Sequence, residues 1–154
     1  MACILKISEA ASLALHTVVY LATQHDGLVS TKQIARVLHA SEAHLSKVLQ
    51  RLARVGIVSS IRGPKGGFAL HKPADAISLL EVYEAIEGPL ALNNCLGDHP
   101  SCSGKQCVLG TLIGNIHDQV SKYLSKTTVS KLNRTYLTEH SHVHCACVAA
   151  AATT

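Results

Sequence analysis

The chain has 154 residues, a length that suits one ordinary domain with a hydrophobic core, or one domain plus an oligomerisation element. Apolar residues make up 47% of the sequence and aromatic residues only 3%, so we expect a core of Leu, Ile, Val and Ala in closely packed helices. No apolar run reaches the roughly 18 residues that a membrane-spanning helix needs, and we expect no membrane partner.

The positive charge is concentrated in the N-terminal half. Residues 1–75 carry nine Lys and Arg against four Asp and Glu, whereas residues 76–154 carry five against six. A polyanionic partner and an ordinary solvated face both explain such an asymmetry. Lys6 and Glu9 interrupt the apolar N-terminus, and no small-residue cleavage site follows, so it predicts a first helix and not a signal peptide. We expect a cytoplasmic protein, where clustered cysteines more often bind metal or react than form disulfides.

Capping and turn residues predict three helices in the first half of the chain. The first helix is expected over residues 8–23. Ser30 and Gln33 have the spacing of a capping box and begin the second helix. Ser41 is a good N-cap for the third helix, which Gly56 ends. The third helix buries one apolar stripe and presents a basic and polar face on its other side. The stripe contains Leu45, Val48, Leu49, Leu52 and Val55.

A hairpin follows the third helix, because the short runs "IVSSI" and "FALH" are separated by the glycine-rich "RGPKGG". Two capped helices and a glycine-tipped hairpin together predict a winged helix-turn-helix, whose second helix enters the major groove of DNA. Between Lys32 and Lys72 there are eight basic residues and only Glu42 is acidic, which favours DNA binding over a merely solvated face. The expected DNA contacts are Ser30, Lys32, Ser41, His44, Lys47, Arg51, Arg54, Arg62, Lys65, Gly66 and Gly67.

The second half of the chain predicts a fourth helix, a loop and a long last helix. Ser78 and Glu81 form a second capping box, and Gly88-Pro89 ends that helix. After the loop, apolar residues at helical spacing form a stripe too wide for a helix that faces only solvent. The fold class is therefore mainly α with a small β-hairpin wing, plus a long dimerisation helix. The expected parts are the DNA-binding domain (1–75), the connecting helix and cysteine loop (76–107), the dimerisation helix (108–135) and a flexible tail (136–154).

The segment "SEAHLSKVLQRLARVGIVSSIRGPKGGFALHKP" resembles the winged-helix segment of the bacterial regulator family that includes IscR, NsrR and RirA. The wing phrase "RGPKGGF" is the most specific part, and the similarity extends from the first helix to about Leu132. The resemblance implies a homodimeric transcription regulator, expected to be a repressor, that binds a double-stranded DNA operator. Many members hold an iron–sulfur cluster, [2Fe-2S] or [4Fe-4S], in a three-cysteine loop, and some relatives have no such cysteines.

The loop of this chain contains Cys95, Cys102 and Cys107 among Gly, Ser and Asn, so three thiolates can converge on one centre. Thiolates are the usual ligands of iron–sulfur clusters and strong ligands of zinc. The spacing is C-x6-C-x4-C, whereas cluster-binding relatives show about five residues in each gap, a departure that keeps the total span close. Reversible thiol oxidation, zinc binding and incidental cysteines are the alternatives to a cluster. The tail sequence "HVHCAC" also contains potential ligands, but we expect it to be a flexible end.

The resemblance leaves the fourth ligand of a cluster open. One branch of the family uses a histidine three residues after the last cysteine, and Gly110 stands there in this chain. Other branches use the first helix of the partner subunit, where Ser12 occupies the carboxylate position and His16 matches a ligating histidine. Glu9 shares that helix face, so His16 and Glu9 of the partner subunit are the candidates, followed by the loop's own Asp98 and His99.

The sequence thus predicts a regulator whose operator binding responds, through the cluster, to redox state, oxygen, nitric oxide or iron. The alternative is a winged-helix regulator that depends on thiols or zinc without a cluster. A small electron-transfer iron–sulfur protein is a distant alternative, because it needs neither a winged helix nor a basic half. We do not expect the protein to be an enzyme, since its sequence shows no carboxylate pair, nucleophile elbow or phosphate-binding loop.

Overall fold

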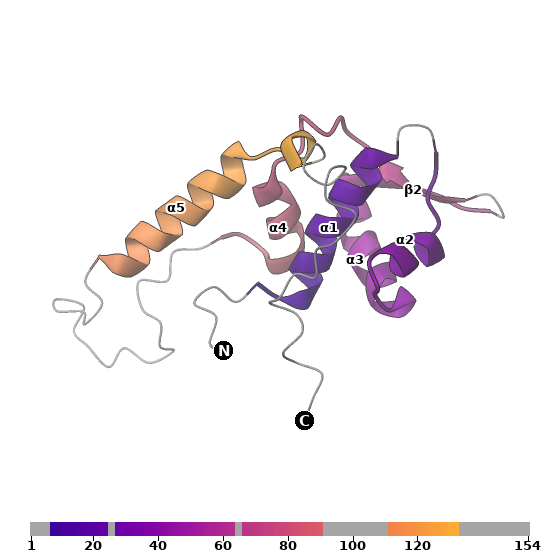
Figure 1. The fold of residues 1–154 in the computed structure, drawn as a ribbon, viewed down its shortest axis with the longest axis horizontal. Coiled ribbons are helices and arrows are strands. Elements are labelled where there is room, and N and C mark those ends of the chain that lie inside the picture. The colour runs from indigo at the N-terminus through magenta and orange to yellow at the C-terminus, as the bar shows by residue number, and fades with distance from the viewer. Residues whose placement is uncertain (1–6, 25–26, 64–65, 91–110, 133–154) are drawn as a thin grey trace, which may run out of the picture.

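A computed structural model describes residues 7–24, 27–63, 66–90 and 111–132 of the chain. In chain order these residues form α1 (Glu9–Thr23), α2 (Thr31–Val37), α3 (Glu42–Arg54), β1 (Val58–Ile61), β2 (Gly67–Leu70), α4 (Leu79–Glu87) and α5 (Leu112–Lys126). The predicted mainly helical fold with a two-stranded hairpin is confirmed. Figure 1 shows the hairpin at one end of the molecule and α5 at the opposite end, with α4 between α5 and α1. No helix among the described residues is long and apolar enough to cross a membrane.

The first four helices all begin at a serine, and the cap signals predict three of these, Ser30, Ser41 and Ser78. Each serine has an extended backbone, and its hydroxyl oxygen accepts a hydrogen bond from the backbone N–H three residues later. These bonds satisfy donors that the first helical turn otherwise leaves without partners. The four caps are Ser8, Ser30, Ser41 and Ser78.

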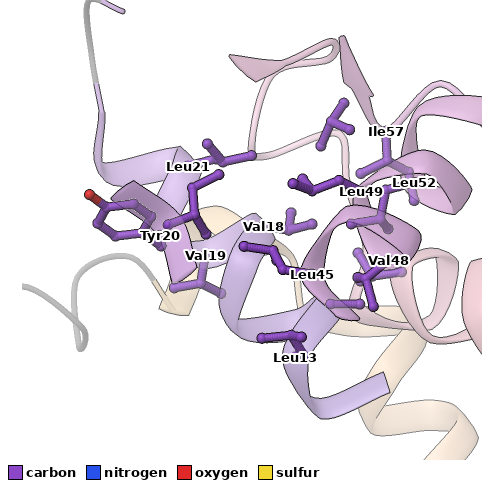
Figure 2. Close-up of a cluster of buried hydrophobic side chains, with 14 of the residues drawn as sticks. Leu13, Val18, Val19, Tyr20, Leu21, Leu45, Val48, Leu49, Leu52 and Ile57 are labelled. Atoms are coloured by element: carbon purple, nitrogen blue, oxygen red, sulfur yellow. The ribbon is translucent and has the colours of Figure 1, made fainter. Parts of the chain in front are cut away.

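The core lies between α1, α3 and α4. Figure 2 shows side chains of α1 such as Val18 facing Leu45 and Leu49 of α3, with Ile57 beyond the end of α3. These four side chains are almost completely buried, and Val82 of α4 belongs to the same cluster. The aliphatic core predicted from the composition is therefore observed, with Tyr20 as an aromatic member. Since α4 shares this core, the helix that the sequence assigns to a connecting segment packs directly against α1 and α3.

The hairpin is joined to the segment before α2. Strands β1 and β2 pair antiparallel, with Ser60 opposite Phe68. The other edge of β2 pairs with Val29, whose N–H donates to the Phe68 carbonyl and whose carbonyl accepts from the Phe68 N–H, both at 2.9 Å. The wing is thus held on the helix-turn-helix by main-chain bonds.

The described part of the segment expected to be a helix over residues 108–135 is helical with one interruption. Helix α5 ends at Lys126, and the chain then turns back against the start of α4. The Val129 N–H donates to the Ile77 carbonyl at 2.9 Å, and the Leu79 N–H donates to the Thr127 carbonyl at the same distance. Val129 is completely buried in the core. These tertiary bonds interrupt the helix at Thr127 and Thr128, and residues 129–132 are helical again.

Candidate nucleic-acid interface

The turn between α2 and α3 sets the angle at which α3 leaves the core. His39 has a left-handed backbone, with φ of 51°, and the Ala40 N–H donates to the Ala35 carbonyl at 2.9 Å. Ser41 then caps α3, its Oγ accepting from the His44 N–H at 3.1 Å. This compact turn places α2 and α3 as in a helix-turn-helix, and Figure 1 shows both helices on the side of the molecule that also carries the wing.

Helix α3 has one buried face and one exposed face. Leu45, Val48, Leu49 and Leu52 are buried, and a helix turns about 100° per residue, so the opposite direction can be read from the sequence. The middle of the exposed face is a single stripe of four side chains. It consists of Ala43, Lys47, Gln50 and Arg54, all exposed.

Gln50 was not among the predicted contacts, although it lies in the middle of this stripe. The missed signal is available in the sequence, because a helical wheel centred on all four buried residues, Val48 included, places Gln50 within about 30° of the opposite direction. A glutamine amide both donates and accepts hydrogen bonds, a combination suited to reading an adenine edge in the major groove.

Two predicted contacts lie instead on one flank of α3, where it meets other helices. The Nδ1 atom of His44 is 3.7 Å from Oε1 of Glu9 on α1. The Nη1 atom of Arg51 donates to the backbone carbonyl of Ile86 on α4 at 3.1 Å. Lys47 and Arg54 thus lie in the exposed stripe, whereas His44 and Arg51 lie beside the helix junction, where Arg51 is also exposed.

The wing places its glycines where side chains do not fit. A Cβ atom on Gly67 would lie 2.7 Å from the Val29 carbonyl oxygen, and one on Gly66 would lie 2.2 Å from that of Ile61. Both glycines thus have a structural reason independent of DNA, and their contact with DNA stays a prediction. Arg62 is exposed at the end of β1, and Lys65 lies outside the described residues.

The remaining predicted DNA contacts lie at or near the first turns of α2 and α3. Ser30 and Ser41 are exposed, and both hydroxyl oxygens accept the N–H groups of their helices. A hydroxyl that accepts can still donate its proton, for example to a phosphate oxygen. Lys32 is exposed in the first turn of α2. All three remain compatible with the predicted role.

The predicted metal ligands fall in two parts of the chain. Cys95, Cys102 and Cys107, together with Asp98 and His99, lie outside the described residues, as does the tail with Cys145 and Cys147. Glu9 and His16 are both exposed on α1, and His16 Nδ1 is 2.8 Å from the Ser12 carbonyl oxygen, to which it donates. In the described part of the chain, no three His, Cys, Asp or Glu side chains come together in a way that would hold a metal ion.

A capped helix-turn-helix with a basic exposed stripe on its second helix and a hairpin wing beside it defines a winged-helix protein. Comparisons with known proteins narrow this class. The model of the Rrf2 family, described as iron-dependent transcriptional regulators, matches residues 7–135, and the chain belongs to this family.

Three relatives illustrate the match. The transcriptional regulator IscR of Erwinia tasmaniensis is 31% identical over 108 residues, which cover 70% of this chain and 66% of that protein, just under two thirds. The structure of CymR, the global cysteine regulator of B. subtilis, superposes with a TM-score of 0.72 and 32% identity over 86% of this chain and 98% of CymR. An oxidized form of Staphylococcus aureus CymR gives a TM-score of 0.69 and 26% identity over 91% and 99%. The matches are transcription regulators, consistent with the expectation that this chain is not an enzyme.

Proposed function

We propose that the chain is a homodimeric repressor that binds a double-stranded DNA operator through α3 and the wing. The observation that carries this proposal is the exposed stripe of α3, in which Lys47, Gln50 and Arg54 face away from the core. Two cations and an amide on one helix face supply both phosphate attraction and hydrogen bonds to base edges. Arg62 of the wing adds a cation beside the helix that enters the groove.

The test removes the cations of the stripe and measures how DNA affinity depends on salt. The probe is a duplex selected from a randomised library by the full wild-type chain. Each cation that neutralises a phosphate contributes about 0.9 to the slope of log affinity against log salt concentration. We expect Lys47→Ala and Arg54→Ala each to weaken binding and to lower that slope by about this amount.

The matched control is Lys122→Ala, which removes another exposed cation from α5, at the opposite end of the molecule from the wing. This control should leave affinity and slope near the wild-type values. If all three variants bind the selected duplex like wild type, α3 is not the DNA-reading element.

We propose that α5 forms the subunit interface. The core side of its apolar stripe is used within the subunit, since Leu124 packs against the core. The other side of the stripe is uncovered, with Tyr123 60% and Leu112 49% exposed. A second copy of the same helix would cover these side chains in a two-fold symmetric contact, the commonest arrangement for a homodimer. A dimer also presents two recognition helices to successive major grooves.

We propose that an iron–sulfur cluster on Cys95, Cys102 and Cys107 controls operator binding. Three thiolates are a donor set that fits such a cluster, and His16 or Glu9 of the partner subunit is the candidate for the fourth ligand. When bound, the cluster would supply a centre sensitive to redox state, oxygen, nitric oxide or iron supply. The cysteine loop joins α4, which packs in the core beside α3, to α5, so changes in the loop can reach both elements.

The alternative is a regulator that uses its thiols or zinc without a cluster. The similarity to CymR favours it, because those neighbours are described as a cysteine regulator and, in one structure, as an oxidized form. Three cysteine thiolates also fit zinc, which accepts sulfur ligands in structural sites. Metal and sulfide analysis of protein purified without oxygen separates the two functions.

A further inference from the structure

The C-terminal end of α4 has a polar main-chain group that its own sequence does not satisfy. The last four carbonyls of a helix lack intrahelical partners, and the negative end of the helix dipole favours a cation there. The last turn of α4 contains no basic residue. The Gly88 N–H donates to the Glu84 carbonyl at 3.0 Å, which still leaves the Ile86 carbonyl without a donor from within the helix.

Arg51 supplies that donor from α3. Its Nη1 atom lies 3.1 Å from the Ile86 carbonyl oxygen, although the two residues are 35 positions apart in sequence. The guanidinium therefore caps α4 both with a hydrogen bond and with its positive charge. Arg51 belongs to α3, the helix that we propose binds DNA, yet its side chain contributes to the packing of α3 against α4.

A second polar contact joins the same flank of α3 to α1. His44 lies about two turns before Arg51 on this flank, and its side chain lies beside Glu9 at the start of α1. Ser8, the cap of α1, donates in turn to the carboxylate of Glu87 at the end of α4. Three separate polar contacts thus join the start of α1, the end of α4 and the flank of α3 in pairs.

We infer that Arg51 is a positioning residue for DNA binding: it caps α4 and holds α3 at the angle that presents the exposed stripe. This inference rests on the proposed function, in which α3 reads DNA, and it changes the role that the sequence predicts for Arg51. The side chain then contributes to the recognition of a particular duplex by orienting Lys47, Gln50 and Arg54. It does not neutralise a phosphate.

The experiment compares Arg51→Ala with Arg54→Ala, two charge-neutralising variants of one helix. Binding is measured to the library-selected duplex and to a scrambled duplex of equal length and composition. We expect Arg51→Ala to weaken binding to the selected duplex about tenfold, with the salt slope and the scrambled-duplex affinity unchanged. Arg54→Ala should weaken binding to both duplexes and lower the slope by about 0.9.

Amide hydrogen exchange provides a readout that needs no DNA. The Gly88 N–H is bonded in the last turn of α4, so loss of the cap should speed its exchange in Arg51→Ala but not in Arg54→Ala. Arg51→Gln is a second variant, and it is measured in place of Arg51→Ala if the alanine variant does not fold. Glutamine keeps an N–H donor without the charge, so the salt slope should stay at the wild-type value.

The inference is overturned if Arg51→Ala or Arg51→Gln lowers the salt slope as much as Arg54→Ala while Gly88 exchange is unchanged. That result would make Arg51 a phosphate contact and leave the proposed function intact. If instead the wild-type chain enriches no duplex from the library, the proposed function fails, and this inference fails with it.

Discussion

Gly67 has no room for a side chain, because the backbone of Val29 passes directly beside it. A Cβ atom at this position would lie 2.7 Å from the Val29 carbonyl oxygen and 2.8 Å from its carbonyl carbon. Neither neighbour is a flexible side chain that can move away. The glycine therefore allows β2 to pair with the segment before α2, and this pairing holds the wing beside the start of α2.

We predict that Gly67→Ala destabilises the fold by about 2 kcal/mol, because the main chain must shift to admit the methyl group. The measurement is the denaturant midpoint of unfolding at unchanged slope. Gly27→Ala is the matched control, since a Cβ atom there meets nothing within 4 Å. It should be neutral or stabilising by about 0.5 kcal/mol, because alanine restricts the unfolded chain. Equal midpoints for the two variants would contradict the close packing at Gly67.

Residue-level features could be predicted from the sequence only where their cause is local. The serine caps depend on residues three positions apart, and the cap signals at Ser30, Ser41 and Ser78 all hold. The roles of His44 and Arg51 depend instead on which helix packs beside α3. A helical wheel gives the direction of the core, but it contains no information on whether a flank faces solvent or the end of α4.

Tertiary contacts also determine features of α5 that its sequence pattern does not predict. Its apolar periodicity predicts the helix, which is observed from Leu112 to Lys126. The pattern does not show where the helix ends, since that depends on main-chain bonds of Thr127 and Val129 to the region of Ile77 and Leu79. The exposure of Tyr123 and Leu112 along one side of α5 is likewise a tertiary property, and it indicates the surface that a partner would cover.

We predict that Ile116→Asp converts the proposed dimer to a monomer or to aggregates. Ile116 lies on the apolar stripe between the covered and uncovered sides, so a carboxylate there would be buried without a partner in the dimer. Sedimentation velocity measures the change in mass, and circular dichroism reports whether the fold persists. Asn115→Asp is the control, because it adds the same charge to the neighbouring, exposed position. An intact Ile116→Asp dimer would mean that the subunits meet elsewhere.

At the scale of the whole molecule, one core connects the parts that the proposed mechanism must couple. Side chains of α1, α3 and α4 are buried in the same cluster, and Val129, beyond α5, joins it. Densely packed interiors transmit displacement instead of absorbing it. The described residues thus place α3, the wing and α5 on a common body, with the wing and α5 at opposite ends (Figure 1). The cysteine loop, residues 91–110, lies outside this description, so its ligands could be predicted only from residue chemistry and resemblance.

The last prediction tests that loop in protein prepared without oxygen. Alanine at Cys95, Cys102 or Cys107 should abolish or strongly destabilise the brown chromophore, because each removes a thiolate that no other donor replaces. Replacing Cys145 and Cys147 together is the matched control and should leave the colour intact. His16→Ala should be intermediate, with an altered spectrum and a shorter lifetime in oxygen, since a cluster that loses one protein ligand keeps three thiolates.

Iron, zinc and acid-labile sulfide are measured on every sample. If the samples contain zinc but no acid-labile sulfide, the cluster proposal is wrong and a zinc site takes its place. A metal-free protein whose operator affinity changes on thiol oxidation would support the thiol alternative. A chromophore that depends on the tail cysteines would contradict the assignment of the loop.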